Sequence, residues 1–169
     1  MASELAAGIL AELRHRNETL ASAESLTGGM IGALLTDVPG ASESYLGGVI
    51  SYATRLKAVL AGVEDATLAE LGPVAARTAV EMAHGVAVKC NADWGLAATG
   101  VAGPDDQNGH PVGQVFVAVS HQRSDLLSVR ELSLEGDRTM IRQLAADASL
   151  RLLAEALGSV TTNEERVPQ

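Results

Sequence analysis

The segment that most limits the possible folds is QVFVAVSHQ, residues 114–122. Its centre is apolar at odd and even positions alike, so both faces of a strand formed there would be apolar. Such a strand is buried on both sides, which requires helices on both faces of its sheet. The next segment, LLSVRELSL (126–134), carries charges in its middle, which places it nearer an edge. The short polar link between the two segments predicts an antiparallel pair.

Helical and strand-like segments alternate along the rest of the chain. Apolar residues recur every three or four positions where we expect helices, which are 3–16, 28–36, 54–62, 75–90 and 138–157. Short segments of strand character are 19–23, 45–53 and 92–100. This alternation predicts an α/β sandwich with a largely parallel sheet. Because no linker or repeat interrupts it, we expect one domain over residues 1–158 and a flexible tail over 159–169.

Composition narrows the function classes. Aromatic residues make up only 2% of the chain, so Ala, Val, Leu and Ile must build the core. The formal net charge of -9 argues against a nucleic-acid-binding face, which needs clustered Lys and Arg. The single cysteine excludes an intrachain disulfide. With no signal-peptide pattern and no apolar stretch long enough for a membrane span, we expect a cytoplasmic protein that binds no membrane.

The first candidate site is ESLTGG, residues 24–29, where an expected strand turns into a helix. In open α/β sheets, ligands bind beyond the carboxyl ends of the strands. Ser25 or Thr27 could simply cap the helix. Alternatively, Ser25 is an exposed nucleophile, and the amides of Gly28 and Gly29 approach an oxyanion or phosphate. The pattern alone leaves both readings open, and it matches neither G-x-S-x-G nor a P-loop.

A nucleophilic serine needs a base. The four histidines are poorly placed, and only His110 lies in a candidate site loop. Lys57 is one of two lysines and lies in the first turn of an expected helix, where the helix dipole lowers the pKa of an amine. It follows Tyr52, at the end of an expected strand, by five residues. A solvated surface lysine is the alternative interpretation.

The third polar cluster is the Gly- and Pro-rich loop of residues 99–113. Its glycines, Gly100 and Gly103 among them, allow the backbone to approach a ligand closely. Asp105 and Asp106 lack the spacing of metal ligands, so we expect a solvated acidic loop and no metal. Further on, Asp137 fits the N-cap of the last helix, and Arg138 could bind a phosphate or carboxylate.

Together these segments resemble a known family. AESLTGG, SYATRLK after YLGGV, GVAGPDxxxxxPVGQV and EGDR occur in the order found in the CinA C-terminal domain family. The resemblance covers about residues 5–157, and the family usually has Cys where Leu26 stands. It implies a three-layer α/β/α sandwich on a mixed, mostly parallel five-stranded sheet, and a homo-oligomer.

The resemblance also implies an activity, because characterised members are nicotinamide-nucleotide amidohydrolases. They hydrolyse the carboxamide of nicotinamide mononucleotide (NMN) to nicotinate mononucleotide and ammonia, without a cofactor. Ser25 would be the nucleophile, Lys57 its base, and Tyr52 the hydroxyl that links or orients them. The implied substrate-contacting residues are Glu24, Thr27, Gly28, Gly29, Thr99, Gly100, Gly103 and Arg138. Among them, amides near Thr27, Gly28 and Gly29 would hold the oxyanion, Thr99 and Gly100 the ring, and Arg138 the phosphate.

Three other functions stay open at this point. The same pocket could bind a phosphorylated nucleotide without turning it over. The family's competence-related name suggests an accessory protein of DNA uptake or recombination, linked to competence or DNA damage, although the net charge opposes direct DNA contact. The amidohydrolase chemistry could also act on another small amide.

Overall fold

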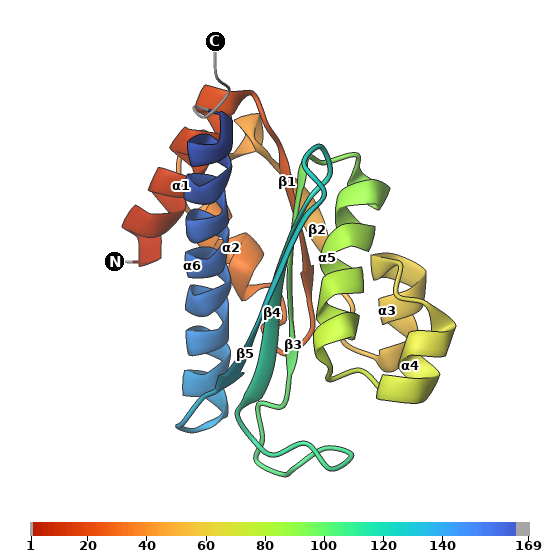
Figure 1. The fold of residues 1–169 in the computed structure, drawn as a ribbon. Coiled ribbons are helices and arrows are strands. Elements are labelled where there is room, and N and C mark those ends of the chain that lie inside the picture. The colour runs from red at the N-terminus through yellow and green to blue at the C-terminus, as the bar shows by residue number, and fades with distance from the viewer. Residues whose placement is uncertain (1, 165–169) are drawn as a thin grey trace.

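The computed structural model describes residues 2–164, in which a five-stranded sheet lies between two layers of helices (Figure 1). The strand order is β2-β1-β3-β4-β5. The strands are β1 (Leu20–Glu24), β2 (Tyr45–Ile50), β3 (Trp94–Gly100), β4 (Gln114–His121) and β5 (Leu126–Ser133). β1 pairs in parallel with β2 and β3, whereas β3–β4 and β4–β5 are antiparallel. The predicted three-layer fold on a mixed sheet is confirmed, with β5 at an edge; its parallel part is confined to β2, β1 and β3.

Helices cover both faces of the sheet. On one face lie α1 (Ala2–Arg16), α2 (Met30–Thr36) and α6 (Arg138–Glu164). On the other lie α3 (Thr54–Ala61), α4 (Asp65–Leu71) and α5 (Ala76–Cys90). A short 3-10 helix, Ala41–Glu43, precedes β2. β4 is buried along nearly its whole length because α5 and α6 pack on its two sides.

The core has two apolar clusters, one on each face of the sheet. Side chains of β3 alternate between them, with Leu96 on the α6 side and Ala97 on the α5 side. The α5 side is lined largely by small residues, so the helix lies very close to the strands. A Cβ added at Gly95 would lie 1.8 Å from the carbonyl oxygen of Ala83 on α5. Close helix–sheet packing therefore explains how the chain fills a core with so few aromatic residues.

The ends of several elements differ from the sequence prediction. The helix expected over 54–62 is α3, which ends at Ala61, and Ala53 holds its N-cap position without a side-chain hydrogen bond. Asp137 does cap α6, accepting from the amide of Met140 at 2.9 Å. α4 was not predicted because only Thr67 is buried in it, so it has no apolar stripe. α6 continues to Glu164, which makes part of the predicted tail helical; residues 165–169 of that tail lie outside the described residues.

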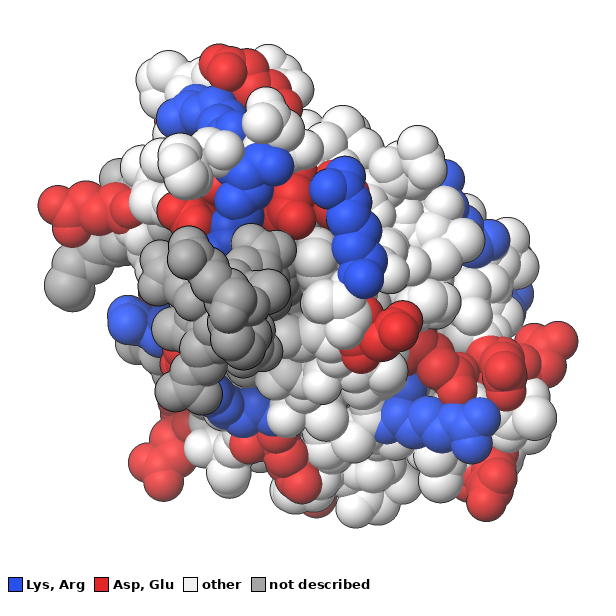
Figure 2. Space-filling view, turned by 45° about the horizontal axis from the view of Figure 1, so that its top comes forward, with Lys and Arg blue, Asp and Glu red and all other residues white. Residues whose placement is uncertain are grey.

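Charged side chains are mixed over the surface seen in Figure 2. Basic and acidic residues are interspersed there, and no broad basic patch forms on that face. In the part of the chain that the structure describes, no helix is both long and apolar enough to cross a membrane.

Candidate active site

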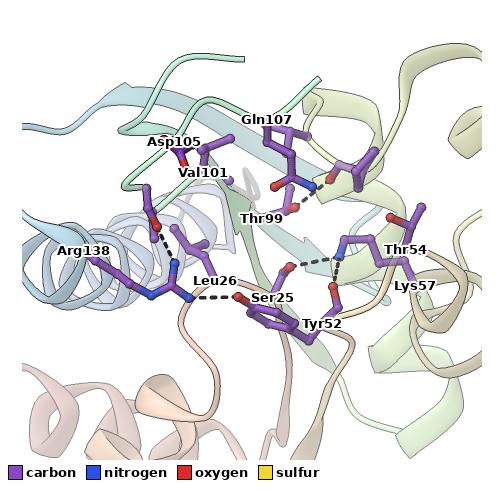
Figure 3. A pocket seen from close by; sticks show the side chains of 15 residues that line it. Ser25, Leu26, Tyr52, Thr54, Lys57, Thr99, Val101, Asp105, Gln107 and Arg138 are labelled. Carbon is purple, nitrogen blue, oxygen red and sulfur yellow. Dashed lines mark hydrogen bonds between the residues drawn. The ribbon is translucent and has the colours of Figure 1, made fainter. Parts of the chain in front are cut away.

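A small pocket opens where the carboxyl ends of β1, β2 and β3 meet (Figure 3). Its volume is about 130 Å³. It brings together seven of the predicted site residues: Ser25, Tyr52, Lys57, Thr99, Gly100, Gly103 and Arg138. The other four predicted residues, Glu24, Thr27, Gly28 and Gly29, do not line it. The pocket is thus assembled from three strand ends, the loop after β3 and the start of α6, as open α/β sheets usually arrange a site.

Ser25 stands at the point where β1 ends. Its amide still donates to the carbonyl oxygen of Ala98 on β3 at 3.0 Å, so the strand ladder holds its backbone. Its residue is 7% exposed, and its hydroxyl faces the pocket (Figure 3). A serine fixed to a rigid strand end is a well-positioned nucleophile.

Lys57 reaches Ser25 from the first turn of α3. Its Nζ donates to Ser25 Oγ at 2.9 Å, to the carbonyl oxygen of Ser51 at 2.8 Å and to that of Tyr52 at 3.4 Å. The residue is only 1% exposed, which rules out the solvated surface lysine. The residues of ESLTGG and SYATRLK therefore meet at a direct serine–lysine contact.

Burial lowers the pKa of Lys57 to about 8. A neutral amine has two N–H groups and one lone pair. The carbonyls of Ser51 and Tyr52 can only accept, so they take the two N–H groups and leave the lone pair directed at Ser25 Oγ. Lys57 is thus both titratable near neutral pH and aimed at the proton of the serine hydroxyl.

The Tyr52 hydroxyl lies elsewhere than expected. It accepts a hydrogen bond from Arg138 Nη2 at 2.9 Å, and within the described residues it makes no hydrogen bond to Ser25 or Lys57. Arg138 Nη1 also donates to the carbonyl oxygen of Gly103 at 2.6 Å. The expectation that Tyr52 links the serine and the lysine is therefore corrected: its backbone carbonyl supports Lys57, and its hydroxyl orients Arg138.

Glu24 supports the turn and does not face the pocket, which corrects its predicted role. The residue is 2% exposed, and its carboxylate accepts from the amides of Gly29 and Ile31 at 2.9 and 3.1 Å and of Gly32 at 2.9 Å. These amides belong to the start of α2, so Glu24 caps that helix. Ser25 is therefore not needed as a helix cap. The N-cap residue of α2 is Gly29, which has no side chain, and Glu24 supplies the capping hydrogen bonds in its place.

The amides of Gly28 and Gly29 are also not available to an oxyanion. Gly28 donates to the carbonyl oxygen of Ser25 at 3.1 Å, and Gly29 donates to Glu24. Both have positive φ, 59° and 103°, so the turn needs glycine for its shape. Instead, the amides of Leu26 and Thr27 have no acceptor within residues 2–164. Leu26 directly follows the serine, and in α/β-hydrolases the residue after the nucleophile supplies an oxyanion donor, which is the sequence signal that points to Leu26.

The remaining pocket wall comes from β3 and the loop after it. Thr99 Oγ1 is buried and donates to the carbonyl oxygen of Pro73 at 2.6 Å, which ties the wall to the start of α5. Gly100 is needed because a Cβ there would lie 2.6 Å from the carbonyl oxygen of Gln114. Two loop residues that were not expected to touch substrate, Asp105 and Gln107, also line the pocket.

The second loop aspartate has a structural role. Asp106 Oδ1 accepts from the amide of Val112 at 2.9 Å, which closes the loop on itself. Nowhere in the described part of the chain do three His, Cys, Asp or Glu side chains gather as metal ligands would.

Comparison with known proteins agrees with this geometry. A family model described as the CinA C-terminal domain matches residues 2–157. A CinA-like protein of Frankia casuarinae is 44% identical over 156 residues, which cover 92% of this chain and 36% of that protein. The crystal structure of the competence/damage inducible protein CihA from Agrobacterium tumefaciens has a TM-score of 0.88 at 33% identity, covering 93% of this chain and 95% of that one. A CinA superfamily protein from Klebsiella pneumoniae has a TM-score of 0.89 at 28% identity, covering 94% and 99%.

The matched region contains the whole pocket, since every residue that lines it lies between residues 2 and 157. The chain spans about a third of the length of the curated relatives it matches, but nearly all of the two crystal structures. From the strand order, the pocket and these matches, the chain belongs to the CinA C-terminal domain family.

Proposed function

We propose that this protein is an amidohydrolase that deamidates nicotinamide mononucleotide through an acyl-enzyme on Ser25. The observation that carries the proposal is the 2.9 Å contact between Lys57 Nζ and Ser25 Oγ, at a buried amine whose pKa is lowered to about 8. A binding module has no need of such an amine, because burying a lysine costs stability unless the group is used.

The first half of the reaction would form the acyl-enzyme. Neutral Lys57 takes the hydroxyl proton as Ser25 Oγ attacks the carboxamide carbon, and the carbonyl oxygen becomes an oxyanion. The amide of Leu26, which lines the pocket and has no acceptor among the described residues, is the donor for that oxygen. Lys57 then returns the proton to the amide nitrogen, the C–N bond breaks and ammonia leaves.

The second half would hydrolyse the ester. A water molecule takes the place of ammonia and loses a proton to Lys57 as it attacks the acyl carbon. The C–O bond to Ser25 breaks, and the proton on Lys57 returns to Oγ. In both halves the carbonyls of Ser51 and Tyr52 accept N–H groups from Lys57, so the lysine changes charge without moving.

The substrate is proposed from the size and charge of the pocket together with the family resemblance. A volume of about 130 Å³ is below the roughly 300–1,000 Å³ of a site that encloses a drug-sized ligand, so it suits an aromatic carboxamide with the remainder of the nucleotide at the mouth. Arg138 lies at the pocket wall and carries the planar fork of donors that suits a phosphate. The specific choice of NMN rests on the resemblance.

The test is ammonia release from NMN by the purified protein in the presence of a metal chelator. We expect nicotinate mononucleotide and ammonia in equal amounts from the wild type, and none above background from Ser25→Ala. Ser42→Ala is the matched control, because Ser42 is exposed on the 3-10 helix and does not line the pocket. Binding of NMN without any ammonia from the wild type would replace the enzyme by a nucleotide-binding module.

A further inference from the structure

The turn between β1 and α2, residues 25–29, is held at its backbone by two side chains of opposite charge. Glu24 accepts three amide hydrogen bonds from the α2 side. From α6, Arg142 donates from Nε to the carbonyl oxygen of Leu26 at 2.8 Å and from Nη2 to that of Thr27 at 3.1 Å. A strand-to-helix turn needs one cap, which Glu24 supplies, so the connection alone does not explain Arg142.

Gly28 admits the Arg142 guanidinium. A Cβ added at Gly28 would lie 3.1 Å from Arg142 Nη2, closer than an ordinary contact, and the φ of +59° disfavours other residues as well. The glycine expected to donate to a ligand thus serves the approach of an arginine to the turn.

Arg142 determines where the amides of this turn point. In a trans peptide the C=O and N–H groups point in opposite directions. The Leu26 carbonyl points at Arg142, so the Thr27 N–H, in the same peptide group, points away from it. The Ser25 carbonyl accepts from Gly28, so the Leu26 N–H points away from the interior of the turn. Within residues 2–164 neither of these two amides of the turn has an acceptor, and of the two residues Leu26 is the one that lines the pocket.

Arg142 also holds the Thr27 carbonyl, and the Gly28 N–H of the same peptide group points the opposite way, at the Ser25 carbonyl, which sets the direction of the Leu26 N–H. Arg142 itself does not line the pocket, so it makes no contact with a ligand there. We propose that Arg142 is a positioning residue that holds this turn, and with it the Leu26 amide, toward the oxyanion. This inference rests on the proposed serine chemistry, and it predicts that Arg142 contributes to the transition state and not to substrate binding.

The experiment compares Arg142→Gln and Arg142→Lys with Arg151→Gln. Arg151 lies on the same helix, is exposed and, in the part of the chain that the structure describes, pairs only with Asp147, so it is the matched control. Two quantities are measured: the rate at which a fluorophosphonate probe labels Ser25, followed by peptide mass spectrometry, and the kcat and KM for NMN. Melting temperatures are recorded for all variants.

We expect Arg142→Gln to lower the labelling rate and kcat together by about 10²-fold with KM within threefold, as for loss of an oxyanion donor. The labelling rate and kcat of Arg142→Lys should lie between those of Arg142→Gln and the wild type, because one ammonium reaches only one carbonyl at a time. Arg151→Gln should have the labelling rate, kcat and KM of the wild type.

Equal labelling of wild type and both Arg142 variants would overturn the inference, even if their melting temperatures fall, because Arg142 would then be purely structural. So would a rise in KM with kcat unchanged, or a wild type that the probe does not label at Ser25. Labelling that depends on Arg142 in a protein that releases no ammonia from NMN would uphold the inference and refute the proposed function.

Discussion

The titration of Lys57 makes a quantitative prediction about the rate. Burial lowers its pKa from 10.5 to about 8, and only the neutral amine can take the proton of Ser25. We therefore expect kcat/KM for NMN to rise tenfold per pH unit below pH 8 and to level off above it. Lys57 acts as a base only in its neutral form, so the rate rises as the amine loses its proton and falls as the pH is lowered.

The magnitude follows from the same value. With a pKa of about 8, roughly 9% of Lys57 is neutral at pH 7 and about 90% at pH 9. With the ordinary value of 10.5, only about 0.03% would be neutral at pH 7, so the buried site supplies nearly 300-fold more active base there. Lys57→Arg, which stays protonated, is expected to lose about 10²–10⁴-fold in rate at every pH.

The assay is initial-rate ammonia release at constant ionic strength between pH 6.5 and 9.5, which keeps the phosphate of NMN largely in one ionisation state. The kcat/KM profile reports the free enzyme and so the pKa that the structure shows. A flat profile over this range would refute the assignment of Lys57 as the base. A kcat/KM that still rises tenfold per pH unit at pH 9.5 would show that burial does not lower the pKa of Lys57 as the structure indicates.

Other perturbations separate the roles of neighbouring residues. Tyr52→Phe removes an acceptor of Arg138 and should raise the KM for NMN about 2- to 10-fold with kcat nearly constant; a large fall in kcat would return the hydroxyl to the catalytic step. Arg138→Gln should raise the KM for NMN at least about tenfold but leave nicotinamide riboside, which lacks the phosphate, within twofold, and equal losses on both substrates would count against phosphate binding. Glu24→Gln should lower the free energy of unfolding in urea by about 1–3 kcal/mol, because three amides lose a charged acceptor, whereas an unchanged midpoint would disprove its capping role. The free energy of unfolding of the wild type, minus that of Lys57→Met, should rise by up to about 1.4 kcal/mol per pH unit between pH 8 and 10. The reason is that in this range Lys57 keeps its proton in the unfolded chain but has lost it in the folded protein. A difference that stays constant with pH would contradict the lowered pKa.

The sequence could predict that Ser25 and Lys57 lie at the same edge of the sheet, although the pattern alone left open a capping serine and a solvated lysine. Polar residues that follow parallel strands meet at one edge of the sheet, and the first turn of α3 follows directly from β2. The same reasoning located the pocket wall at Thr99 and Gly100, which end β3.

Side-chain direction is what the sequence pattern could not reveal. The Tyr52 hydroxyl points at Arg138, which lies 86 positions further along the chain, and not at the nearby lysine. Glu24, next to the nucleophile, turns inward because the amides at the start of α2 attract its carboxylate more strongly than the pocket does. The contact of Arg142 with the turn depends on how α6 packs, so no local pattern indicates it.

The pairing of β3 with β4 shows the same limit in the fold. The long loop of residues 101–113 could lead to a parallel or an antiparallel neighbour, and β4 is buried in either case. The sequence therefore indicates that both segments are strands, whereas the relative direction of β3 and β4 depends on contacts across the sheet.

The acyl-enzyme on Ser25 tests the account most directly. The protein is mixed with NMN, quenched in acid within the first turnover and digested, and the peptide that contains Ser25 is weighed by mass spectrometry. We predict a fraction of that peptide heavier by the acyl group of nicotinate mononucleotide, absent from Lys57→Met and transferable to hydroxylamine in the native protein. Ammonia release at full rate with no such adduct and no hydroxamate would show that water attacks NMN directly, and would contradict Ser25 as the nucleophile.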